Sequence, residues 1–159
     1  MDYPKPYDAP APSQEVRASA LFVDLDLTII DGIAVRMSDE ELAKANLIES
    51  TMKQIDKAEM MGIPVVMVTR NSREGMNRVF SIRPDLEERF DEVLCYSQKS
   101  GLINGFIQSR RLDAKSALFI DDTQSELDDV QQNSEGVSAV ETGKTDSIDL
   151  DRMPMDLAA

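Results

Sequence analysis

The chain has 159 residues, 42% of them hydrophobic, which suits one domain with a sizeable buried core. Its 30 acidic and 17 basic residues leave a net charge of −13, which argues against a protein that binds long nucleic acids through an overall positive field. The sequence has no histidine and one cysteine, which excludes Ser-His-Asp catalysis, internal disulfides and the usual zinc sites, and it shows no signal peptide or membrane span, so we expect a cytoplasmic protein without membrane association.

The composition divides the chain into three parts. Residues 1–18 contain four prolines and few apolar residues, which predicts a flexible N-terminal arm outside the fold. Residues 19–142 alternate apolar runs with helical patterns and form the predicted folded domain. Residues 143–159 are rich in Asp, Ser and Thr, which predicts a weakly ordered acidic tail.

Five short apolar runs predict the strands, at residues 20–25, 63–69, 92–96, 116–120 and 137–140. A capping box formed by Ser38 and Glu41 opens a helical pattern that continues to Gly62. Further helices are predicted at residues 73–80, 100–110 and 123–132. This order predicts an α/β protein with a three-layer, Rossmann-like, doubly wound fold, a central and mainly parallel five-stranded sheet, and no large cap domain.

Polar residues follow each predicted strand at its carboxyl end, where functional groups gather in folds of this kind. They are Asp24 and Asp26, Thr69 and Arg70, Lys99, and the pair Asp121 and Asp122. Several carboxylates brought together would raise one another's pKa unless a cation offset their charge. Oxygen ligands without histidine or cysteine favour Mg²⁺, and a hydroxyl and an ammonium group nearby suit a phosphate.

These residues, in this order, resemble the motifs of the haloacid dehalogenase superfamily of phosphohydrolases. The resemblance spans about residues 20–140 and rests on LFVDLDLT, on VVMVT ending at Thr69, on a lysine, and on ALFIDD. We assign the lysine to Lys99, because Lys115 lies at the start of the fourth predicted strand, about 20 Å from its acidic end. Receiver domains use similar residues, but they carry the acidic pair after the first strand. Leu27 departs from the glycine that many family members have.

The resemblance implies a Mg²⁺-dependent phosphomonoester phosphatase in which Asp24 is the nucleophile and Asp26 the acid and base. It implies that Asp24, Asp122 and the carbonyl of Asp26 bind Mg²⁺, with Asp121 in support. Thr69 and Lys99 would bind the substrate phosphate. Independently of the resemblance, Arg70 and Arg73 flank the second motif and could bind a second anionic group of the substrate, and we include Arg70 among the candidate phosphate ligands. Two questions stay open at this point: whether Arg70, Arg73 or the N-terminal arm contacts substrate, and whether Glu126 supports the metal.

The short connections predict an open site, since residues 29–37 leave room only for a small flap. In capless relatives an open site serves macromolecular phosphates or is closed by a neighbouring subunit, so a homo-oligomer that covers the site is one alternative. The substrate is a phosphorylated small molecule or the phosphate end of a macromolecule. The competing hypotheses are a catalytically weak binding or scaffold protein with this fold, and a phosphatase of polynucleotide 3′-phosphate ends.

Overall fold

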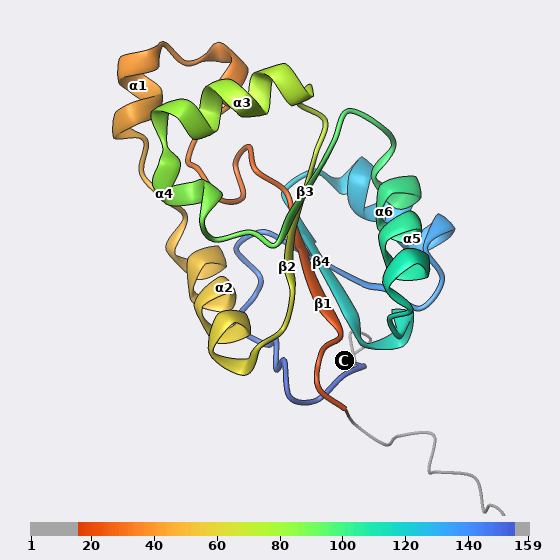
Figure 1. Ribbon diagram of the computed structural model, residues 1–159. Helices are drawn as coiled ribbons and strands as arrows, with labels where there is room; N and C mark the ends of the chain where they lie inside the picture. The colour runs from red at the N-terminus through yellow and green to blue at the C-terminus, as the bar shows by residue number, and fades with distance from the viewer. Residues whose placement is uncertain (1–15, 155–159) are drawn as a thin grey trace, which may run out of the picture.

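The computed structural model describes residues 16–154, which form a five-stranded parallel sheet with helices on both faces (Figure 1). The strands are β1 (Ala20–Val23), β2 (Val65–Thr69), β3 (Glu92–Cys95), β4 (Ala117–Asp121) and β5 (Ser138–Glu141). Their order in the sheet is β3-β2-β1-β4-β5, so the chain winds away from β1 in both directions. The predicted strands and doubly wound fold are confirmed, and residues 16–154 contain no large cap domain. The crevice where the winding reverses lies beyond the ends of β1 and β4.

The two faces of the sheet bury separate apolar cores. Helices α2 (Glu49–Met61) and α3 (Arg73–Ile82) and the short α4 (Pro84–Glu87) cover one face. Helices α5 (Lys99–Arg110) and α6 (Gln124–Asn133) cover the other. Strand β1 contributes alternate residues to the two cores, Leu21 and Val23 to the first and Phe22 to the second. Because both faces are covered, the strand is apolar throughout, as the sequence predicted.

The single helix predicted after Ser38 is wrong, because the chain forms two helices there. The capping box of Ser38 and Glu41 is present and opens α1 (Asp39–Lys44), which follows the 3-10 helix η1 (Ala34–Arg36). The helix then stops, because the backbone of residues 46–48 bonds to the loop after β1: Ile48 N–H donates to the Ile29 carbonyl. Helix α2, with 13 residues, is too short to cross a bilayer, and so is every other helix in residues 16–154.

The segment after β5 packs against the domain and is not a solvated end. Ile148, Leu150 and Met153 are buried in the core on the α2 face, and Met153 pairs through its backbone with Val16. These three apolar side chains explain the difference from the predicted weakly ordered tail, because an acidic composition does not prevent a few large residues from being buried. The predicted N-terminal arm lies mostly outside the described residues. The domain boundaries themselves stay predictions.

Candidate active site

Lys99 and two aspartates form the buried centre of a site at the carboxyl edge of the sheet. Asp24 follows β1, Asp121 ends β4, and Lys99 opens α5. The Lys99 ammonium donates hydrogen bonds to Asp24 Oδ1 at 2.8 Å and to Asp121 Oδ2 at 2.6 Å. All three side chains are almost completely buried. The structure therefore brings Lys99 to these carboxylates, whereas Lys115 lies in the 3-10 helix η2 (Ala114–Ser116) at the opposite end of β4.

Asp122 completes a compact group of three carboxylates. One oxygen each from Asp24, Asp121 and Asp122 lies within 4.8 Å of the other two. Opposite ligands of a Mg²⁺ ion are about 4 Å apart, because each bond to oxygen is about 2.1 Å long. The donors are all oxygens, which suits a hard cation. By donor chemistry and spacing, these three residues fit the expected metal.

Burial governs the ionisation of this centre. Desolvation raises the pKa of Asp24 well above its ordinary value and also raises the pKa of Asp121, while the Lys99 charge opposes both shifts. Burial alone would lower the pKa of Lys99, but the two carboxylates outweigh it and the pKa is raised. One ammonium does not offset the charge of three adjacent carboxylates, whereas a second cation would.

Asp26 is held beside the acidic group by contacts of its own. Its Oδ1 accepts a hydrogen bond from the Ala34 backbone N–H at 2.8 Å, and its Oδ2 accepts one from Asn71 Nδ2 at 3.2 Å. The Asn71 amide also donates to Thr69 Oγ1 at 2.9 Å. The structure thus joins two predicted site residues, Asp26 and Thr69, through a residue to which the sequence analysis assigned no role.

Arg70 reaches the site but is engaged in an ion pair. Its Nε donates to Glu126 Oε2 at 2.8 Å and its Nη2 donates to Glu126 Oε1 at 3.1 Å. Both residues line a cavity of about 210 Å³, with Asp24, Asp26, Leu27, Ile33, Lys99, Asp122 and Thr123. Arg73 is absent from that lining, and its Nη2 donates to the Val93 carbonyl at 2.8 Å.

Helix α6 positions the start of α5, and with it Lys99. Asp129 accepts hydrogen bonds from the Ser100 backbone N–H at 3.0 Å, from Ser100 Oγ at 3.0 Å and from Gln98 Nε2 at 2.6 Å. A carboxylate that accepts backbone N–H groups at the first turn acts as a cap for the helix. Asp129 therefore holds the two residues on either side of Lys99 at the start of α5.

The turn after β1 is shaped by Leu27 and Thr28. Leu27 has a left-handed φ of 59°, a conformation that glycine adopts without strain and that is uncommon for a leucine. The Thr28 hydroxyl donates to Asp24 Oδ2 at 3.2 Å and lies 2.8 Å from the Thr142 hydroxyl. Thr142 also donates its backbone N–H to the Asp121 carbonyl, at 2.9 Å. The residue after β5 thus contacts the turn after β1 and the end of β4.

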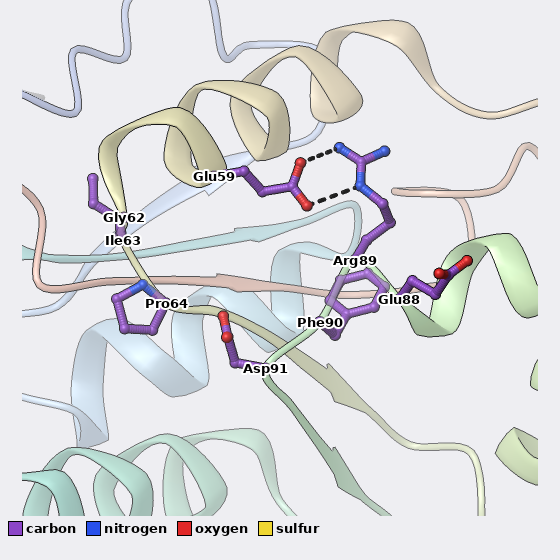
Figure 2. A pocket seen from close by; sticks show the side chains of 8 residues that line it. All are labelled: Glu59, Gly62, Ile63, Pro64, Glu88, Arg89, Phe90 and Asp91. Atoms are coloured by element: carbon purple, nitrogen blue, oxygen red, sulfur yellow. Dashed lines mark hydrogen bonds and ion pairs between the residues drawn. The ribbon is translucent and has the colours of Figure 1, made fainter.

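A second hollow, of about 310 Å³, lies at the opposite end of the sheet and is not a competing site (Figure 2). Three of its charged side chains, Glu59, Arg89 and Asp91, bind another side chain or the backbone. Arg89 forms ion pairs with Glu59 and Asp56, and Asp91 accepts a hydrogen bond from the Val65 N–H at 2.8 Å. The three-carboxylate group at the carboxyl edge is the one such cluster found in residues 16–154.

The arrangement of the strands and helices agrees with solved structures of one kind. The N-terminal part of a Bacteroides fragilis protein containing a phosphatase domain, complexed with Mg, matches with a TM-score of 0.66 and 18% identity over 78% of this chain. A haloacid dehalogenase-like family protein from Streptococcus pneumoniae matches with a TM-score of 0.56 and 15% identity over 77% of this chain. A HAD-superfamily hydrolase from Geobacter sulfurreducens matches with a TM-score of 0.62 and 13% identity over 78%. This chain has the fold of the haloacid dehalogenase-like (HAD-like) hydrolases.

The extent of the match differs among these HAD-like proteins. The chain covers 36% of the Bacteroides fragilis chain, 83% of the Streptococcus pneumoniae chain and 89% of the Geobacter sulfurreducens chain. No protein-family model matches the sequence, and no curated protein matches it. The HAD-like fold is therefore recognised from its three-dimensional arrangement, at identities too low to transfer an activity.

Proposed function

We propose that this protein is a Mg²⁺-dependent phosphomonoester phosphatase that acts through an aspartyl-phosphate on Asp24. The observation that carries the proposal is the setting of Asp24. Its buried carboxylate is paired with Lys99, lies within 4.8 Å of Asp121 and Asp122, and lines a cavity at the crevice of a doubly wound sheet. The phosphatase domain and bound Mg of the Bacteroides fragilis protein support the same chemistry.

In the first step Asp24 attacks phosphorus, so that an oxygen–phosphorus bond forms to Asp24 and the ester oxygen–phosphorus bond breaks. Asp26 gives its proton to the departing oxygen. Asp26 then removes a proton from water, and the water oxygen attacks phosphorus and breaks the bond to Asp24. Inorganic phosphate leaves, and both aspartates regain their starting ionisation states.

Lys99 and Thr69 bind the oxygens of the phosphoryl group through an ammonium and a hydroxyl. Asp24, Asp122 and the carbonyl of Asp26 would hold Mg²⁺, and Asp121 supports the site through Lys99. Mg²⁺ supplies positive charge that offsets the carboxylates and the phosphate. Arg70 is the weakest of the assigned phosphate ligands, because one edge of its guanidinium, formed by Nε and Nη2, is already bound to Glu126.

The site admits both small and macromolecular substrates, as judged from the part of the chain that the structure describes. Residues 16–154 include no large cap domain, and the cavity has a volume of about 210 Å³. A phosphorylated small molecule and the phosphate end of a macromolecule are both compatible with this site. A second copy of the chain that covers the cavity is part of the same proposal.

The test is phosphate release from aryl phosphates, and from a 3′-phosphorylated oligonucleotide, with Mg²⁺ or with a chelator. We expect Mg²⁺-dependent turnover by the wild-type protein and none by Asp24→Asn. Mass spectrometry of acid-quenched wild-type protein should detect one added phosphoryl group on the peptide that contains Asp24. Turnover that survives Asp24→Asn would contradict the nucleophile assignment, and no turnover of any substrate would favour a binding protein.

A further inference from the structure

Asn71 connects two groups of the proposed mechanism. It lies two residues after β2, in front of α3, and its side chain is partly buried. Its Nδ2 donates to Asp26 Oδ2 at 3.2 Å and to Thr69 Oγ1 at 2.9 Å. A side-chain amide nitrogen has two N–H donors, so these two bonds use both of them.

The bond from Asn71 completes the support of the Asp26 carboxylate. The other oxygen, Oδ1, accepts the Ala34 backbone N–H at 2.8 Å, from the start of η1. Each oxygen of Asp26 is therefore held from a different segment of the chain. A partly exposed carboxylate with one such bond could rotate about its side-chain bonds, whereas two donors on opposite oxygens restrict that rotation.

Asn71 also determines what the Thr69 hydroxyl can do. Thr69 Oγ1 accepts the Asn71 side-chain N–H at 2.9 Å and the Asn71 backbone N–H at 3.1 Å. A hydroxyl oxygen has two acceptor lone pairs and one donor, so both acceptor positions are filled. The Thr69 proton is then directed away from Asn71 and is available to a phosphoryl oxygen.

We propose that Asn71 is the positioning residue for Asp26, holding it where it donates its proton to the leaving oxygen. This inference rests on the proposed function. An acid is needed most when the leaving oxygen is strongly basic and least when it leaves readily as a stable anion. Loss of Asn71 should therefore harm the hydrolysis of alkyl phosphates more than that of nitrophenyl phosphates. The orientation of Thr69 affects every phosphate equally, because all share the same phosphoryl group.

The experiment measures kcat/KM for a series of phosphate monoesters whose leaving groups span a wide range of pKa. For Asn71→Ala we expect a fall of about 100-fold for an alkyl phosphate and of only about 3-fold for a dinitrophenyl phosphate. Asn71→Ser should behave alike, because its shorter side chain does not span the distance to Asp26. Asp26→Asn shows how steeply kcat/KM depends on leaving-group pKa when the acid is lost completely. Asn104→Ala is the matched control, since it removes an amide that donates to the Asn133 carbonyl between α5 and α6 at 2.8 Å.

A steeper dependence on leaving-group pKa in both Asn71 variants, with wild-type behaviour in Asn104→Ala, supports the inference. If kcat/KM of the Asn71 variants depends on leaving-group pKa as it does in the wild type, the inference is overturned. This holds whether activity falls equally for all substrates or does not fall at all. If the dependence of kcat/KM on leaving-group pKa is also unchanged in Asp26→Asn, both the inference and the assignment of Asp26 as the acid are overturned. The proposed function fails separately, through activity that survives Asp24→Asn.

Discussion

The ammonium of Lys99 lies 2.8 Å from the carboxylate of Asp24, although 75 residues separate them in the chain. The pair is buried, with side-chain exposures of 3% and 7%. A buried ion pair contributes little net stability by itself, but removing one partner leaves a charge that water cannot reach. The pair thus links the chemistry of the site to the stability of the fold.

Lys99→Met should destabilise the protein strongly. Because Asp24 and Asp121 would lose the ammonium that pairs with both of them in a buried position, we expect a loss of about 3–5 kcal/mol in the free energy of unfolding, measured by urea denaturation with a chelator present. Lys115→Met is the control, because Lys115 is exposed at the other end of β4, and a change within about 0.5 kcal/mol is expected there. Equal losses in the two variants would contradict this account of Lys99.

Mg²⁺ should stabilise the folded protein through the three-carboxylate group. A ligand that binds only the folded state at 100 times its dissociation constant adds about 2.7 kcal/mol. We expect the thermal midpoint to rise with Mg²⁺ concentration in the wild type and not in Asp122→Asn. Sodium chloride at equal ionic strength is the control, because screening of a net charge of −13 also stabilises the protein. A midpoint that rises equally in both proteins would place Mg²⁺ binding elsewhere.

Glu126→Gln should decide the role of Arg70. The pair is partly solvated, with 55% of the Arg70 side chain exposed, so its loss should cost less than about 1 kcal/mol of stability. If the released guanidinium binds a second anionic group, KM for a substrate that carries one should fall about 2- to 5-fold, and the fall should vanish in the double variant with Arg70→Ala.

The matched control for that experiment is Glu92→Gln, which breaks the exposed ion pair with Arg110 at the edge of the sheet. A KM that is the same in Glu126→Gln and Glu92→Gln would assign Arg70 a structural role with Glu126 and remove it from the phosphate ligands.

Asp129 should make stability depend on pH. Burial works to raise the pKa of Asp129, but hydrogen bonds from Asn133, Gln98 and Ser100 outweigh it and lower the pKa. A lowered pKa in the folded state means that the stabilisation is present above the unfolded-state pKa of about 4 and is lost as pH falls through the folded-state pKa. We expect Asp129→Asn to cost about 1 kcal/mol at pH 7 and less at pH 3, in urea titrations at both values. A cost that does not change with pH would contradict this.

Leu150→Ala should test the packing of the segment after β5. Leu150 is 1% exposed within the core, and truncating a buried leucine costs about 2–5 kcal/mol. Asp151→Ala, at an exposed neighbouring position, should change stability by less than about 0.5 kcal/mol. Equal effects in urea denaturation would mean that this segment does not contribute to the core in solution.

The positions of the strands and of most site residues could be predicted from local sequence. Strands covered on both faces must be apolar throughout, so the runs ending near Val23, Thr69 and Ile120 are visible without any neighbour. Parallel strands place their carboxyl ends at one edge of the sheet, so the polar residues that follow them are expected to lie close together there. The choice of Lys99 over Lys115 follows from the same rule, and the structure agrees with it.

Pairings between distant segments needed the tertiary structure, because local patterns carry no information about partners. The contact of Arg70 with Glu126 joins residues 56 apart, and the role of Asn71 depends on a carboxylate 45 residues before it. The helix predicted after Ser38 is interrupted because the backbone of residues 46–48 forms hydrogen bonds with the loop after β1. The acidic neighbours of Leu150 predicted a solvated segment, whereas in the structure Leu150 is buried in the core. Local sequence is enough to predict which residues gather at the carboxyl edge of the sheet. Which of these residues bind one another depends on distances that are set only when the helices pack on the sheet.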